Sequence, residues 1–456
     1  MEHLFSLISL PFDLFARAGG GGSSGGGGGG SGGSGGGESI LFFLGYIPMH
    51  FLGAAFAKIS KKHAVLVIIL NIVGWIVALL YAMMWVLIWG WMGAAIGALA
   101  LLGMAAGLYG LFSKLRQSKQ VKAGLLAAAA QDKAWDEATL VAFAKDTFLK
   151  YQQDWSSFNK ASIQTDTTPA YFYHSSLLLY TLELMGRRDE MTEVMINDAT
   201  IVSAQDAADN NQDSFTIGFI ASAVDKLIEK QTEVTLFTDR SSFSEYWTFR
   251  RSGATWLLDD ISQSTADIFS LNEEMRQFAA QHNFCYSEDM GWLFIPKRGQ
   301  LFGGAKFGTS DINNHVVGLY NNQLLIQLYS YVKDPQAKST QYVIAQANVP
   351  RQYGDIVVRR KKALQLFGIR GLEKIETEWL DFNKKYEVFA SNHEQATSFE
   401  LLNPTYMEQL EALGFEVSIE VVDNVIYLYT SERTASVEVY ASMLDLLNKA
   451  FKEMRL

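Results

Sequence analysis

The sequence lacks the residue patterns that usually mark a metal centre or an enzyme. Cys285 is the single cysteine among 456 residues, so no disulfide can form within the chain and no cysteine-based metal site is expected. The histidines are scattered, with no pair at i and i+4, which also argues against a metal site. No nucleophile elbow, Walker loop or dinucleotide fingerprint occurs. We therefore expect no catalytic residues, no metal and no cofactor.

Charge is absent from one long stretch, because no Asp, Glu, Lys, Arg or His occurs between Ala64 and Ser113. As one helix this stretch would be more than twice as long as the bilayer's hydrocarbon core of about 30 Å. The sequence therefore predicts a transmembrane helical hairpin over 64–113, with its bend at Gly90–Gly93. A buried helix of a globular domain is the alternative interpretation.

Basic residues flank the uncharged stretch on both sides, at Lys58, Lys61, Lys62, Lys114, Arg116, Lys119 and Lys122. By the positive-inside rule both flanks belong on the cytoplasmic side. This pattern predicts an integral membrane protein whose residues after Lys122 are cytoplasmic, with the lipid bilayer as a partner. Residues 39–57 are a possible further span, which Gly45 and Pro48 interrupt.

Small residues recur inside the uncharged stretch, at Gly93, Gly97, Gly103 and Gly107. This spacing permits close helix approach. It predicts either packing within the hairpin or a homo-oligomer.

The first part of the chain divides into two short segments. Residues 1–18 are apolar and are interpreted as an interfacial helix or, alternatively, as a cleaved signal. Residues 19–37 contain only Gly and Ser, a composition typical of a flexible linker.

The rest of the chain is acidic, and the formal net charge of the whole is −10. An acidic body argues against nucleic acid as a partner, since binding it requires neutralisation of phosphates.

Hydrophobic periodicity predicts an α+β domain over 123–267. Helices are expected first and long antiparallel strands after them. The most distinct of these elements are Ser175–Met185, Met191–Gln205, Ser214–Lys230, Ser244–Arg251 and Ala254–Ser262.

A second α+β domain is predicted over 268–456. It begins with a helix near Ile268 and ends with an amphipathic helix at the C-terminus. Between them we expect a helix from Asn403-Pro404 to Gly414 and strands at Gly291–Ile295, His315–Tyr320, Leu324–Val332, Tyr342–Ala347, Glu416–Val422 and Val425–Thr430.

The strand pair Ser244–Arg251 and Ala254–Ile261 resembles the end of the Tim-forty-four-like domain, which the mitochondrial import tether, a mitochondrial ribosomal protein and bacterial membrane proteins share. The similarity carries back to Thr168–Phe172 and covers about 140–267. It implies a nuclear-transport-factor-two-like cone of helices on a curved sheet, no catalytic residues and a bacterial inner membrane. The end region, Lys384–Phe389 to Leu402–Met407, resembles a bacterial membrane-protein domain of unknown function.

Aromatic residues of the first domain are the candidates for lining a binding pocket, namely Tyr171, Phe172, Trp247, Phe249 and Trp256. The alternative is that these rings fill a core. The sequence thus favours a membrane-anchored, non-enzymatic scaffold that binds a protein segment or lipid. The alternatives are a cone-fold isomerase or dehydratase using His174, Tyr173 or Asp260, and a translocation or ribosome biogenesis factor.

Charged pairs and runs are interpreted more simply. Asp259 and Asp260 are adjacent on a strand, so they are expected to point to opposite faces. We predict that Arg250-Arg251 and the run Arg359–Lys362 are exposed. Alternatively, the run Arg359–Lys362 binds anionic lipid or an acidic partner.

Overall fold

The computed structural model describes residues 119–262, 270–294, 312–332, 341–361, 368–392, 402–422, 424–430 and 436–456. These residues fall into two compact units, one holding 119–140 and 200–204, the other holding 141–199 and 205–456. Within the first unit, η1 (Lys133–Trp135) starts at Asp132, whose side chain accepts a hydrogen bond from the Ala134 amide.

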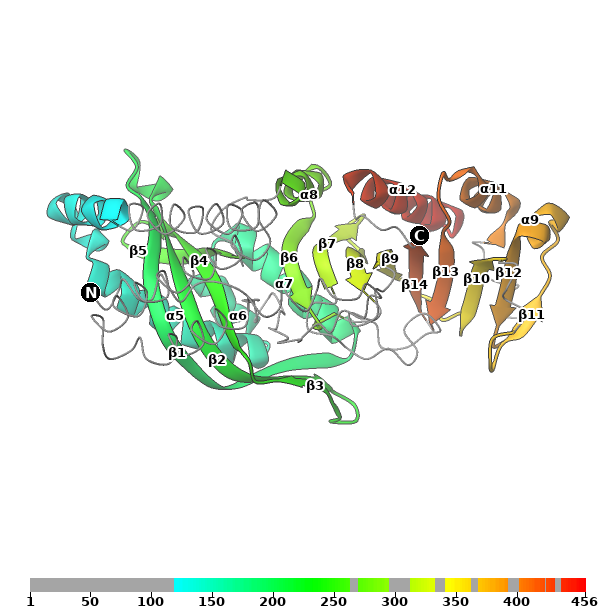
Figure 1. Cartoon of the computed structure of the whole chain (residues 1–456), viewed down its shortest axis with the longest axis horizontal. Coiled ribbons are helices and arrows are strands. Elements are labelled where there is room, and N and C mark those ends of the chain that lie inside the picture. Colours follow the sequence, from blue (N-terminus) through cyan, green and yellow to red (C-terminus); the bar gives the residue numbers. More distant parts are fainter. Residues whose placement is uncertain are drawn as a thin grey trace, which may run out of the picture. The chain divides into compact units, whose positions relative to one another are not determined.

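The first sheet of the chain has five antiparallel strands in the order β1-β2-β4-β5, with β3 paired to β2. Figure 1 shows the long strands of this sheet in green. The strands are β1 (Arg187–Gln205), β2 (Ser214–Glu229), β3 (Thr235–Asp239), β4 (Ser242–Ser252) and β5 (Thr255–Ser262). The predicted hairpin about Ser252-Gly253 is confirmed, and Gly253 turns the chain at φ 61°.

Three helices belong to this part of the chain, α5 (Glu137–Ser156), α6 (Lys160–Asp166) and α7 (Pro169–Leu184). Thr168 caps α7, Pro169 stands in its first turn, and Gly186 follows its end at φ 65°. This is the usual arrangement of Pro at the start of a helix and Gly after its end.

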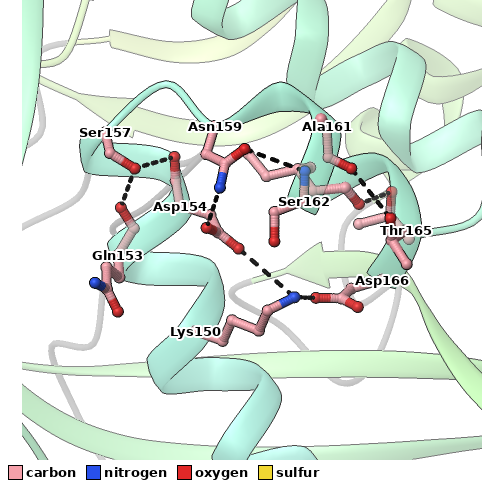
Figure 2. A network of polar contacts seen from close by, with 11 residues as sticks. Lys150, Gln153, Asp154, Ser157, Asn159, Ala161, Ser162, Thr165 and Asp166 are labelled. Carbon is pink, nitrogen blue, oxygen red and sulfur yellow. Dashed lines mark hydrogen bonds and ion pairs between the residues drawn. The ribbon is translucent and has the colours of Figure 1, made fainter.

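The loop between α5 and α6 is held by polar side chains (Figure 2). Asn159 donates from Nδ2 to Asp154 at 3.0 Å, while its Oδ1 accepts from the Ser162 amide at 3.3 Å. Lys150 on α5 pairs with Asp166 at the end of α6. The network fixes α6 against the C-terminal end of α5.

The second sheet has nine antiparallel strands in the order β11-β12-β10-β13-β14-β9-β8-β7-β6, and Figure 1 shows them in this row. They span Glu373–Ile375 (β11), Tyr386–Ala390 (β12), Ile356–Arg360 (β10), Ser418–Val422 (β13), Val425–Thr430 (β14), Gln341–Asn348 (β9), Leu324–Val332 (β8), Ile312–Tyr320 (β7) and Cys285–Gly291 (β6).

Helices cover one face of this sheet and build its core. They are α8 (Ser270–Gln281), α9 (Leu380–Lys385), α11 (Pro404–Ala412) and α12 (Val437–Glu453). Residues such as Met275, Leu410 and Leu447 from the helices pack with Val316, Leu328, Ile419 and Leu428 from the strands. On the strands these core residues alternate with residues of the opposite face, as the pleat requires.

The strand predicted at Gly291–Ile295 is misplaced. The structure ends β6 at Gly291, which has φ 50°, and Trp292, Leu293 and Phe294 follow as buried residues of a turn. Their apolar character reflects burial in a turn and not a strand.

The predicted fold class included transmembrane helices, and this part needs correction. In the described portion of the chain, no helix combines the length and the apolar character needed to cross a membrane. The apolar helix α7 has 16 residues, fewer than the roughly 20 that a span needs, and the longer α5 carries Lys145, Asp146 and Lys150. The structure shows helices with antiparallel sheets.

The segments on which the membrane prediction rested lie outside the described residues. These are the hairpin 64–113, the possible span 39–57, the segments 1–18 and 19–37, and the glycines Gly93, Gly97, Gly103 and Gly107. With no spanning helix among the described residues, the prediction of an integral membrane protein with transmembrane helices is corrected.

Candidate functional site

The aromatic residues predicted to line a pocket lie mostly in the interior of the first sheet. Trp247 and Phe249 are fully buried, and Tyr171 and Trp256 are exposed by 6% and 7%. Phe172 is half-buried. Trp247 contacts Phe148 and Tyr151 of α5, and Phe249 and Trp256 both contact Phe215 of β2. Trp247 and Phe249 also contact each other, so the rings form one connected set. The rings pack against one another, and their role in binding stays a prediction.

A buried set of polar groups surrounds Trp247, which we call the tyrosine–glutamate cluster: Tyr151, Tyr171, Ser175, Glu245 and Trp247. The indole Nε1 of Trp247 donates to Glu245 Oε2 at 2.7 Å, and the hydroxyls of Tyr151 and Ser175 lie 3.1 Å apart. Tyr171 also hydrogen-bonds Tyr151. Polar contacts thus join α5 to α7, and β4 meets α5 through the rings of Trp247 and Tyr151.

Burial governs the ionisation of this cluster. Burial, with a smaller contribution from the nearby Glu245, raises the pKa of Tyr151 to about 12, although hydrogen bonds with Ser175 and Tyr171 act to lower it. It also raises the pKa of Tyr171 well above its usual value, with Tyr151, Asp260 and Glu245 acting in the same direction. Both phenols therefore stay protonated and act as hydrogen-bond donors. Because these polar groups hydrogen-bond one another inside the core, few donors or acceptors are left to act on a substrate.

Sequence reasoning missed Tyr151, Ser175 and Glu245. The available signal was the position of Glu245, two residues before Trp247 and therefore on the same face of the strand. An acidic residue on a face otherwise made of Phe243, Trp247 and Phe249 indicates a buried partner.

The three residues of the enzyme alternative have different surroundings. Tyr173 is 43% exposed on α7. His174 Nε2 lies 3.0 Å from the hydroxyl of Ser287 on β6. Asp260 lies on β5 opposite Thr248.

Asp259 and Asp260 are separated by a backbone irregularity. The register between β4 and β5 shifts after Thr248, which pairs with Asp260, so that Phe249 pairs with Leu258. Asp259 is therefore the extra residue of a bulge. Its side chain accepts from Thr168 Oγ1 at 2.9 Å and from Arg250 at 2.8 Å.

The arginines predicted to be exposed divide into exposed and buried members. Arg250 is half exposed, whereas Arg251 pairs at 3.1 Å with the fully buried Asp213. Arg359 is mostly buried and pairs at 3.2 Å with Glu387, its cross-strand neighbour on β12. The prediction of exposure is wrong for Arg251 and Arg359, because each neutralises a carboxylate that the fold buries.

Helix α7 presents apolar side chains outward. Tyr173, Tyr180 and Leu184 are 43%, 37% and 40% exposed. Their spacing of seven and four residues places them on one side of the helix. We call them the exposed face of α7. Leu177, which lies between them along the same side, is buried, as are Leu178 and Leu182 on the opposite side. The exposed face therefore stands on a rigid support.

Within the described ranges, no group of three or more His, Cys, Asp or Glu side chains could hold a metal ion.

Comparison with known proteins finds a family match in the C-terminal region. Residues 337–456 match a family described as "Protein of unknown function (DUF3137)". This agrees with the predicted resemblance of the end region to a domain of unknown function. No curated protein matches the chain.

The family assignment predicted for 140–267 is corrected. The family that matches lies at 337–456, and none of the findings supports a Tim-forty-four-like domain. That assignment, and the fold and location that it implied, are withdrawn.

Two solved structures are similar over part of the chain. One is the mycobacterial trehalose monomycolate transport factor A, TtfA, with 14% identity, 40% of this chain and 95% of that chain covered, and a TM-score of 0.29. The other is the intermembrane space region of the chloroplast protein ARC6, with 13% identity and a TM-score of 0.22. The match covers 27% of this chain and 94% of that chain. At these scores neither structure informs the function.

Proposed function

We propose that this chain is a non-enzymatic binding protein, a scaffold that docks a segment of another protein on the exposed face of α7. The observation that carries the proposal is the outward display of Tyr173, Tyr180 and Leu184 on a helix whose other side is buried. Tyrosine is enriched at protein interfaces and among the residues that contribute most binding energy.

The composition of α7 supports a protein partner. Between Pro169 and Leu184 the only acidic or basic residue apart from His174 is Glu183, and Glu183 pairs with Lys160 at 2.9 Å. The middle of the helix therefore offers no net charge. A partner segment with an apolar stripe of its own would bury these rings at small electrostatic cost.

The interior of the first sheet supports a role without catalysis. The polar groups of the tyrosine–glutamate cluster hydrogen-bond one another and are buried. A catalytic acid or base needs access to a substrate and a pKa near the working pH. The two phenols have neither, because burial raises the pKa of each.

Photocrosslinking in intact cells tests this function. A photoreactive phenylalanine analogue is placed at Tyr180, and in a matched chain at Asp146, an exposed polar position on α5. The proposal predicts a discrete adduct from position 180 that Leu184→Lys removes. Equal adducts from position 146, or an adduct that survives Leu184→Lys, would overturn it.

A further inference from the structure

Two histidines lie close to each other within the unit formed by 141–199 and 205–456. His174 on α7 contacts Ser287 on β6 at 3.0 Å. Ser287 stands directly opposite His315 in the β6–β7 pairing. His315 Nε2 in turn lies 2.9 Å from Gln327 Oε1 on β8. One line of polar side chains thus runs from α7 across three strands.

The surroundings of this line are aromatic and carry positive charge. The ring of Phe294 stacks on His315 at 5.1 Å, and that of Tyr171 lies 6.0 Å from His174. Arg276 on α8 lies near enough to disfavour a proton on His174, as does His315. In the described residues, no carboxylate is among the groups that shift the pKa of either imidazole.

Two carboxylates share β6 with Ser287, namely Glu288 and Asp289, and neither is among the groups that shift the pKa of His174 or His315. Asp289, further along β6, accepts from the Gly291 amide at 2.8 Å. Burial raises the pKa of Cys285 on β6, and burial together with the nearby Cys285 raises the pKa of Tyr173 on α7. Tyr329 on β8 lies 6.2 Å from His315, and burial raises its pKa as well.

We propose that His174, Ser287 and His315 form an acid-sensitive latch between α7 and β6. With both imidazoles neutral, the Ser287 hydroxyl donates to His174 Nε2 and the latch is closed. A proton on His174 removes that acceptor and adds a cation beside Arg276. A second proton on His315 adds another cation across the β6–β7 pair. Acidification therefore separates α7 from β6 while the strands of both sheets stay paired.

The pKa values agree with this geometry. Although part of His174 remains exposed, enclosure of its imidazole, together with the nearby His315 and Arg276, lowers its pKa to about 3. Burial lowers the pKa of His315 to about 4, although the hydrogen bond between its Nε2 and the Gln327 carbonyl oxygen acts to raise it. The pKa of an imidazole that is released from the latch returns toward 6.5, so protonation favours the open latch. The inference does not require the binding role of α7.

Cys285 gives a direct readout of latch opening. It lies two residues before Ser287, on the same face of β6, and it is the only thiol of the chain. The full-length chain is mixed with a dithiodipyridine reagent, which releases a coloured product even in acid. The labelling rate of Cys285 is divided by the rate for glutathione at the same pH, which gives a relative rate. Far-UV circular dichroism shows whether the chain stays folded.

The latch predicts that the relative rate at Cys285 rises on going from about pH 7 to about pH 4.5, by about 100-fold per released imidazole. His174→Gln with His315→Gln flattens this rise, because neither side chain can take the proton. His282→Gln, at an exposed position after α8, leaves it unchanged. Ser287→Ala speeds labelling at neutral pH and keeps the acid dependence.

Two results would overturn the latch. One is a relative rate at Cys285 that does not change with pH in the unaltered chain. The other is the same acid acceleration in His174→Gln with His315→Gln, given a circular dichroism spectrum equal to that of the unaltered chain. His174→Gln alone serves as the second variant if the double substitution prevents folding.

Discussion

The hydroxyl of Thr168 donates a hydrogen bond of 2.9 Å to the carboxylate of Asp259. Thr168 caps α7, and its Oγ1 also accepts from the Tyr171 amide, while Asp259 is the bulged residue of β5. The start of the helix that we propose as a docking surface is thereby fixed to the edge of the first sheet. The backbone reinforces this junction, because the Thr168 amide donates to Leu258 O at 2.8 Å.

Removing the cap should cost stability. Thr168→Ala loses both hydrogen bonds of the hydroxyl, and we expect the free energy of unfolding to fall by about 1–2 kcal/mol. Urea denaturation at neutral pH measures it. Thr165→Ala is the matched control, since Thr165 is exposed on α6 and bonds only to Ala161 O among the described contacts. Equal effects of the two substitutions would contradict the role of Thr168.

Two adjacent arginines should differ in importance. Arg251→Met leaves the fully buried Asp213 without its guanidinium, and breaking a buried pair on one side costs about 3 kcal/mol. Arg250→Met breaks an ion pair whose arginine is half exposed, and we expect a loss below about 1 kcal/mol. Thermal and urea unfolding compare the two variants. A larger loss for Arg250→Met would refute this assignment.

Gly318 should tolerate no side chain. A Cβ at this position on β7 would lie 1.8 Å from the ring of Phe284, so Gly318→Ala is expected to destabilise the protein by about 1–3 kcal/mol. Gly414→Ala is the control, because no atom lies within 4 Å of a Cβ there. Phe284→Leu should restore part of the loss in the double variant. Independent, additive effects would show that the ring is not the obstacle.

Stability should fall in mild acid because of His315. Burial lowers its pKa to about 4 from an ordinary 6.5, so the unfolded chain binds more protons between these values. The stability that the neutral imidazole contributes is fully present above pH 6.5 and is lost as the pH falls toward 4. The free energy of unfolding then falls by up to about 1.4 kcal/mol per pH unit. Urea denaturation from neutral to mildly acidic pH measures the slope. His315→Gln should reduce that slope, and an unchanged slope would count against the assignment.

Much of the secondary structure could be predicted from local pattern. Leu324–Val332 is a strand with the predicted bounds, because apolar residues fill its length. The helix from Pro404 starts at its Asn403 cap as predicted. By contrast, β10 (Ile356–Arg360) was missed, since its arginines suggested an exposed run. Its neighbour on β12, Glu387, makes the strand possible by neutralising Arg359, and that pairing is not visible locally.

The candidate sites were predictable only in part, for a related reason. Tyr171 and Trp247 stand out in the sequence as aromatic residues. By contrast, Tyr151 and Ser175 pair between two helices, and Glu245 pairs with Trp247 inside the buried interior. The link between His174 and Ser287 joins residues that are 113 positions apart. Such tertiary contacts leave no periodic signal in the chain.

The central claim is that the exposed face of α7 binds a protein segment. The most direct test is to measure, by isothermal titration calorimetry, the affinity of the purified chain for the partner that crosslinking captures. Tyr180→Asp should weaken binding by at least about 10-fold, since it places a charge in an apolar contact. Asp146→Ala, on α5, should leave the affinity unchanged. Equal affinities for the unaltered chain and Tyr180→Asp, with both proteins folded, would contradict the claim.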